Sequence, residues 1–363
     1  MKKILFVLMT AALLAACDNP LEFTPASKAD MLILNGHLTT DEETHTVFVS
    51  VSHTEYVSMV KSGELRCYVN GTLVAKTTTL TEIDSNSYYA EQGEYFTFKA
   101  PFKAGDVVRI EVDADGFKAW NEQVVPAVPD VSKIDTVSVR QRSDWGEVDN
   151  CYRFDTTLKD VDPEESFFRL AIWDHCDAVF YKDDVEIGTG SSERLVSFFA
   201  DDDPILNEGH FNADEFFEIG STNEYGVITD NMFAGGSATL KPIVSKSYFG
   251  AVVFMEEADS VKVSPKAIVK VFGIGKPYFY YFKALNSLRS GSTDLALEDV
   301  QIPDNIEGGI GFIGIANPYT ASFTLEEYSF PLRYTFYETS PSLASMRSRG
   351  ASLRSTRLSA SRR

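Results

Sequence analysis

Histidine and cysteine are scarce in this chain of 363 residues, which contains five histidines and four cysteines. The cysteines form no C-x-x-C pair, so a zinc ribbon is excluded. The sequence also lacks the G-x-S-x-G, H-E-x-x-H and P-loop patterns, and no G-x-G-x-x-G follows a predicted strand. We therefore expect a protein that is not an enzyme and that carries no cofactor.

Basic residues are scarce outside the C-terminal tail. The formal net charge is −20, although six arginines crowd the tail beyond Pro341. An acidic body argues against nucleic acid as a partner, because phosphate groups are bound by basic surfaces. The tail itself, residues 342–363, is rich in Ser and Arg without hydrophobic periodicity, and we expect it to be disordered.

The start of the chain carries a secretory signal that ends in a lipobox. An apolar run of about 11 residues follows Lys2 and Lys3, too short to cross a bilayer but typical of a signal peptide. It ends in Leu-Ala-Ala-Cys17, the pattern of a bacterial lipoprotein. We predict a signal peptide over residues 1–16, a lipid such as palmitate on Cys17, and a tether over residues 17–30. The lipid would make the membrane a partner of the protein.

Residues 31–126 alternate between apolar and polar side chains in short runs. Val47, Val49 and Val51 share one face, and Asn70-Gly71 separates two such runs in the manner of a hairpin turn. This pattern predicts an immunoglobulin-like β-sandwich, with an open antiparallel sheet as the alternative. The expected strands cover residues 47–51, 65–69, 73–75, 87–89, 95–98, 107–112 and 117–125.

A Pro-Ala-Val-Pro segment at residues 126–129 predicts a domain boundary. The fold class that we expect is mainly β, with a larger antiparallel β domain over residues 130–341 and one prominent helix over 277–289. An aromatic stripe and Pro277 in its first turn indicate that helix. Residues 174–246 look irregular and contain a helix start at 212–215. Strands are expected at residues 134–140, 152–157, 167–173, 248–255, 261–272, 308–316 and 321–330.

Two features of the larger domain are candidate binding sites. Asp201, Asp202 and Asp203 precede Pro204, and carboxylates in a loop suit calcium, although the pattern favours a solvated or capping acidic turn. Trp145 is the tryptophan that we expect to be exposed and able to stack on a sugar or peptide.

Three cysteines remain in the mature chain, at positions 67, 151 and 176. They are read either as buried thiols that act as small hydrophobes or as one disulfide plus a free thiol. His175-Cys176 suggests a metal site, but adjacent residues of a strand point to opposite faces.

Several segments occur in an order that carries a family resemblance: the lipobox, residues 31–36, residues 201–207, the aromatic helix and the Asn-Ile-Glu-Gly-Gly-Ile-Gly-Phe run at 305–312. The chain resembles the Bacteroidetes lipoprotein family catalogued as domain of unknown function 4249, over about residues 17–335. The resemblance implies an outer-membrane lipoprotein, often produced alongside a TonB-dependent transporter, with no catalytic residues to carry over. The Arg-rich tail departs from the family pattern.

The run at residues 305–312 has two interpretations. Its glycines permit positive φ or close backbone approach, and Asn305 and Glu307 would bond backbone groups. Alternatively, Asn305 and Glu307 belong to a ligand-binding loop.

These observations predict a lipid-anchored binding or accessory component of a nutrient-uptake system at the outer membrane. The sequence leaves open whether the protein lies on the periplasmic side of this membrane or on the cell surface. Two other hypotheses are a metal-dependent hydrolase that uses the 174–246 region and a structural protein of the envelope or of a surface filament.

Overall fold

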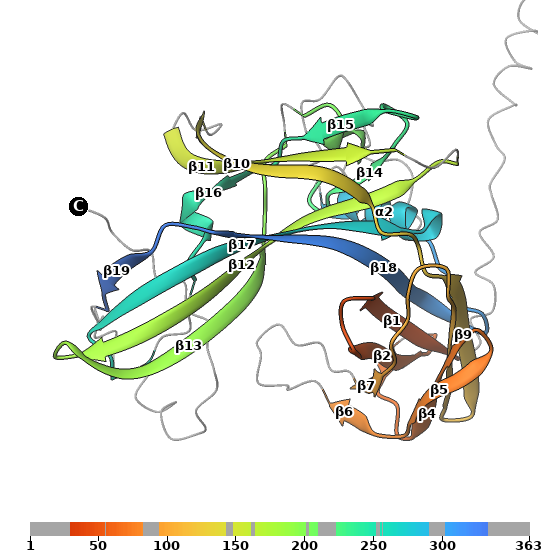
Figure 1. Cartoon of the computed structure of the whole chain (residues 1–363). Coiled ribbons are helices and arrows are strands. Elements are labelled where there is room, and N and C mark those ends of the chain that lie inside the picture. Colours follow the sequence, from red (N-terminus) through yellow and green to blue (C-terminus); the bar gives the residue numbers. More distant parts are fainter. Residues whose placement is uncertain are drawn as a thin grey trace, which may run out of the picture.

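The chain is mainly β, as the sequence predicts, and one α-helix occurs among the residues that the structure describes (Figure 1). No helix in this part of the chain is long and apolar enough to span a membrane. The structure is a computed structural model, and it describes residues 30–332 apart from 55, 83–93, 143–147, 161–163, 201–202, 210–222, 252–254, 256 and 290–301.

The largest element is an 11-stranded sheet that draws on both ends of the described chain. Its strands are β1 (Met31–Thr39), β2 (Thr44–Ser52), β3 (Val57–Ser58), β6 (Leu80–Glu82), β7 (Glu94–Lys99), β12 (Phe167–Lys182), β13 (Val185–Val196), β14 (Val227–Thr229), β17 (Ser260–Ile274), β18 (Gly309–Thr324) and β19 (Tyr328–Pro331). The main path runs β13-β12-β17-β18-β1-β2-β7-β6. β1 and β18 pair in parallel, whereas β1 with β2 and β17 with β18 pair antiparallel.

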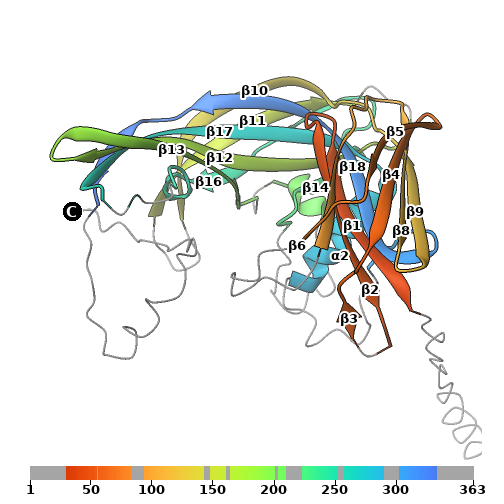
Figure 2. The ribbon, with the colours of Figure 1, turned by 90° about the horizontal axis from the view of Figure 1, so that it is seen from below.

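Two four-stranded sheets pack against the large sheet. The first contains β4 (Gly63–Val69), β5 (Thr72–Thr77), β8 (Val107–Ala114) and β9 (Phe117–Val124). The second contains β10 (Asp130–Arg142), β11 (Val148–Lys159), β15 (Ser237–Leu240) and β16 (Ile243–Ser245). Figures 1 and 2 show the two small sheets over different parts of the long strands.

Side-chain alternation along β18 shows that both small sheets cover the same face of the large sheet. Ile313 and Ile315 join the core with the first small sheet, and Tyr319 and Phe323 join the core with the second. Odd-numbered residues of one strand share a face, so we call this face the covered face. Phe312, an even-numbered residue, packs instead under helix α2 (Lys276–Arg289). The side of the sheet that carries α2 is the helix face.

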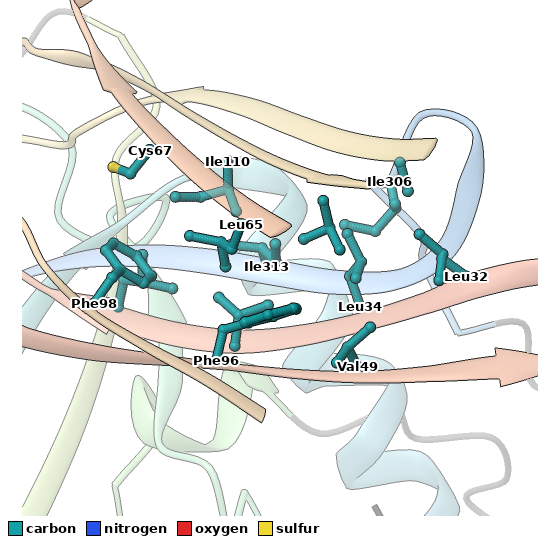
Figure 3. Close-up of a cluster of buried hydrophobic side chains, with 14 of the residues drawn as sticks. Leu32, Leu34, Val49, Leu65, Cys67, Phe96, Phe98, Ile110, Ile306 and Ile313 are labelled. Carbon is teal, nitrogen blue, oxygen red and sulfur yellow. The ribbon is translucent and has the colours of Figure 1, made fainter. Parts of the chain in front are cut away.

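The N-terminal sandwich has the core that the alternation predicts. Val47, Val49 and Val51 are buried together with Leu65 and Cys67. Figure 3 shows Val49, Leu65 and Cys67 within this cluster. The Asn-Gly turn at residues 70–71 has φ of 51° and 75°, as a two-residue hairpin turn of type I′ requires. Regular alternation and one strong turn signal therefore account for these strands and for the side that they bury.

β18 joins the sandwich to the rest of the molecule. The sequence divides the chain into domains over residues 31–126 and 130–341, but the sandwich contains β18, which pairs with β1 from Leu32–Gly309 to Thr39–Ala316. The chain crosses to the second small sheet at Pro129–Asp130, next to the predicted boundary. The two regions thus share one continuous sheet.

The prediction of an irregular region over residues 174–246 is wrong for most of the residues described there. β12 continues to Lys182 and turns at Asp183-Asp184, both with positive φ, into β13. The sequence of β12 does not alternate cleanly between apolar and polar residues, because Asp174, a charged residue, lies on the buried side of this strand. Two short 3₁₀ helices, Leu206–Gly209 and Lys246–Tyr248, also lie in this region.

Two other predicted strand assignments differ from the structure. Described residues between 248 and 255 lie outside any strand, because Gly250 has a φ of 87° and its N–H donates to Asp174. The strands predicted at 308–316 and 321–330 are one strand, β18, followed by β19. The Asn317-Pro318 pair resembles the end of a strand. The Asn317 side chain, however, accepts from Thr40 Oγ1 and donates to the Pro126 carbonyl, and β18 continues through both residues.

The predicted helix at 277–289 is confirmed as α2, whereas the features predicted at residues 87–89, 212–215 and 342–363 lie outside the described residues.

Candidate functional site

Asn305 fastens its loop to β18. Its Nδ2 donates to the Ile313 carbonyl at 2.8 Å, and its Oδ1 accepts from the Ile313 N–H at 3.0 Å. Asn121 Nδ2 donates to the Asn305 carbonyl at 2.7 Å. The Asn305 amide therefore bonds the backbone, as one of its two interpretations from the sequence requires.

Glu307 makes its contacts through its backbone. Its N–H and carbonyl form a reciprocal pair with Trp120 at 2.8 and 2.9 Å, and its side chain is exposed. The neighbouring Gly308 and Gly311 have φ of 75° and 113°. A Cβ at Gly311 would overlap the Leu34 carbonyl oxygen, so this run allows β18 to approach β1 closely.

Asp203 caps a turn. It is buried, its Oδ1 accepts from the N–H groups of Ile205 and Leu206 at 2.9 and 3.0 Å, and its Oδ2 accepts from the Lys241 N–H at 2.6 Å. Asp201 and Asp202 lie outside the described residues. Within the described part of the chain, no group of three or more His, Cys, Asp or Glu residues is placed to hold a metal ion.

Cys17 and Trp145 also lie outside the described residues. The other two tryptophans are half-buried in strands and face cations. The Arg109 guanidinium lies 3.9 Å from the ring centroid of Trp120, and Lys270 Nζ lies 5.2 Å from that of Trp173.

The three thiols at positions 67, 151 and 176 are buried and free, which confirms the buried-thiol interpretation over a disulfide. Burial raises the pKa of both Cys67 and Cys176 to about 12, so these thiols stay protonated at neutral pH. His175 points away from Cys176 and lies 3.3 Å from Glu193 and 3.4 Å from Asp177. The adjacent histidine and cysteine thus lie on opposite sides of β12.

Sequence reasoning did not identify the most distinctive polar group, which lies under helix α2. We call this group of side chains the α2 cluster. Its members, from three strands, a loop and the helix, are His37, Arg169, Tyr225, Tyr278, Tyr281, Phe282 and Phe312. Their rings lie close together, with 4.8 Å between the centroids of Phe282 and Tyr278 and 4.9 Å between those of Phe282 and Tyr225.

Helix α2 docks through its aromatic stripe. Pro277 lies in the first turn, where its missing N–H costs no helical hydrogen bond. Tyr278 and Phe282 are buried, and the Tyr281 ring stacks on Phe312 of β18 with 4.2 Å between centroids. Gly314 of β18 lies directly below the Tyr278 ring, where a side chain would collide with it.

His37 is a neutral hydrogen-bonding group in this cluster. The Tyr278 hydroxyl and His37 Nδ1 are 2.7 Å apart, and burial raises the pKa of Tyr278. Burial and the neighbouring Arg169 lower the pKa of His37 to about 4, although the ring keeps an exposed surface. At neutral pH the imidazole is therefore neutral, and we infer that the phenol, the more acidic of the two groups, donates to Nδ1, which leaves the imidazole proton on Nε2.

Arg169 is a cation among aromatic rings. Its guanidinium lies 4.7 Å from the ring centroid of Phe282 and 5.6 Å from that of Phe272, and its Nε donates to the Tyr225 carbonyl at 3.2 Å. Burial lowers its pKa. Among the residues described, no carboxylate lies within ion-pair distance of it.

The α2 cluster can therefore bind but shows no nucleophile or acid–base pair among its described side chains. It offers a guanidinium, an imidazole N–H and ring surfaces, which suit an anionic or polar ligand with an apolar part. One signal for it was present in the sequence: Arg169 is a single charge within the apolar run Phe-Phe-Arg-Leu-Ala-Ile at 167–172.

A comparison with protein families finds one match over most of the chain. The family described as domain of unknown function (DUF4249) matches residues 18–322. A search of curated proteins finds no match.

Proposed function

The chain belongs to the DUF4249 family, and from this premise we propose that it is a lipid-anchored, non-catalytic binding or accessory component of a nutrient-uptake system at the outer membrane. The anchor is supported by the Leu-Ala-Ala-Cys17 lipobox. The family resemblance supports a TonB-dependent transporter as the partner.

The binding role depends on one observation: among the residues that the structure describes, Arg169 has no acidic partner. A buried charge is costly unless it is paired, and cation–π contacts compensate only in part. Arg169 lies on the helix face next to His37, whose ring is exposed and donates from Nε2. A ligand that supplies the missing acceptor gives this arrangement a function.

The hydrolase hypothesis is less well supported. It requires the carboxylates of Asp201–Asp203 as metal ligands, and both oxygens of Asp203 accept backbone N–H groups. Binding of a cation there would have to replace bonds that hold the turn together. Metal analysis of the purified protein tests this alternative, which predicts a stoichiometric ion and loss of stability with a chelator.

One observation favours the structural alternative, a self-assembling envelope protein. β13 is the terminal strand in the described path of the large sheet, and Val185 and Leu195 on it are 64% and 50% exposed. An unpaired edge strand of this length can accept another strand. If the protein assembles through it, V185K/L195K abolishes the assembly, whereas wild-type protein that sediments as a monomer at all concentrations contradicts it.

The main proposal is tested in the native membrane. Full-length protein is labelled with an alkyne analogue of palmitate and recovered from membranes in mild detergent, together with C17A and, as a matched control, S27A. We expect the wild type and S27A to be labelled and to co-purify with a β-barrel transporter, and C17A to lose both properties. Unlabelled wild-type protein, or labelled protein recovered alone, contradicts the proposal.

A further inference from the structure

We infer that Arg169 anchors a binding site for a small organic carboxylate, whose apolar part packs on the aromatic rings of the α2 cluster. The inference rests on the proposed binding function and names the ligand class. It starts from the geometry of Arg169, since the Nε donates to Tyr225 while the two terminal nitrogens have no described acceptor.

The shape of the guanidinium selects the acceptor. Its terminal nitrogens present parallel N–H groups that match the two oxygens of a carboxylate or phosphate. The guanidinium plane also rests near the Phe282 and Phe272 rings, which restricts its orientation. A planar acceptor in the plane of the guanidinium would accept both of these bonds.

The surroundings favour a carboxylate over a phosphate. Arg169 supplies one positive charge, and burial raises the pKa of its neighbour Tyr278, which is a neutral phenol at pH 7. A carboxylate with one negative charge is balanced by this cation, whereas a phosphate monoester carries nearly two and loses more hydration among aromatic rings.

The remaining groups suit the rest of such a ligand. The half-buried Tyr281 ring offers apolar surface, and His37 Nε2 is a neutral donor for a hydroxyl or carbonyl oxygen. His37 and Arg169 both pack on Phe282, at 5.7 Å and 4.7 Å from its ring centroid, so one small molecule can reach both.

The test compares three probes on the full chain in nonionic detergent by isothermal titration calorimetry: benzoate, its uncharged analogue benzamide and inorganic phosphate. We expect saturable binding of benzoate at least tenfold tighter than that of either other probe. Absence of benzoate binding, or equal binding of benzamide, overturns the inference. Phosphate that binds as tightly as benzoate overturns the choice of carboxylate.

Variants assign the binding to Arg169. R169M removes the charge and is expected to weaken benzoate at least tenfold, and R169K, which keeps the charge but not the paired donors, to weaken it severalfold. R140M, the same substitution at an exposed arginine of β10, should bind as the wild type does. Should R169M fail to fold, R169K decides, and wild-type affinity in R169K contradicts the inference.

The outcome is independent of the anchoring experiment. If the wild-type protein carries the lipid and co-purifies with the transporter but does not bind benzoate, this inference alone is wrong. Benzoate binding by a protein that carries no lipid and has no partner overturns the proposed function alone.

Discussion

Two charged side chains on opposite faces of the large sheet, Asp174 and Arg169, differ in how their polar atoms are paired. On the covered face, Asp174 is fully buried and accepts from the N–H groups of Gly250 and Ala251 at 3.0 Å, with Arg194 at 3.5 Å. On the helix face, Arg169 has no described carboxylate partner, and His37 keeps an exposed surface.

This difference separates side chains that maintain the fold from side chains that are available to a ligand. A buried polar group whose partners belong to the protein stabilises one arrangement of the backbone. A buried polar group without such partners contributes little to the stability of the fold, and its presence is better explained by a ligand that supplies the partner. Substitution of Asp174 should therefore lower the stability of the fold far more than substitution of Arg169.

The largest effect is expected on the covered face, at Asp174. D174A leaves the buried N–H groups of Gly250 and Ala251 without an acceptor and should lower the free energy of unfolding by about 3–5 kcal/mol. D177A is the matched control, three residues along the same strand, where an exposed pair with Lys266 contributes about 0–1 kcal/mol. Urea denaturation measures both, and similar losses would remove the distinction between the faces.

Docking of α2 on the helix face should be the next most sensitive feature. G314A places a methyl group against the Tyr278 ring and should cost about 1–3 kcal/mol as the helix shifts. G275A, whose Cβ would meet Pro277 Cδ at an ordinary 3.7 Å, serves as the control. If both variants unfold at the wild-type urea concentration, α2 is not seated on β18 as described.

A smaller, pH-dependent effect is expected from His37. Folding lowers the pKa of His37 from 6.5 to about 4. Between these two pH values the histidine is therefore mostly protonated in the unfolded chain and mostly neutral in the folded protein. Stability therefore falls as the pH decreases from about 6.5 to about 4, and H37N should reduce that slope. Denaturation at several pH values checks this, with Y278F as a control that keeps the imidazole and hence the slope.

The smallest effect is expected at Arg169 itself. Because no described acid pairs with it, R169M should change the free energy of unfolding by no more than about 1 kcal/mol, in either direction. A loss above 2 kcal/mol would show that Arg169 holds the fold together, as Asp174 does on the opposite face.

Regular periodicity accounts for the parts of the fold that could be predicted. Val47, Val49 and Val51 alternate without interruption, the Asn70-Gly71 turn has a backbone requirement that few residues meet, and the stripe of α2 recurs at helical spacing. Each signal is local, so its physical cause is visible within a few residues of sequence.

The missed features depend on partners that are distant in the sequence. The sequence predicts an irregular region from residue 174 onward, because the partners of Asp174, Gly250 and Ala251, are 76 and 77 residues away. The pairing of β18 with β1 carries no local signal either.

The candidate site was missed for the same reason. Arg169 is distinctive only because α2, which follows it by more than 100 residues, covers it with aromatic rings. Asp203 and Asn305, which the sequence did highlight, bond backbone groups.

The parallel pairing of β1 and β18 sets the order in which the protein can mature. Thr40 and Asn317 are bonded where the pairing of β1 with β18 ends, they are 277 residues apart, and the chain is synthesised from its N-terminus. β1 therefore emerges long before its neighbour and exposes an open edge and half of a sandwich core meanwhile. A chain shortened before Gly309 would keep this exposed edge permanently, so synthesis must deliver nearly all of the described chain before its first strand is protected.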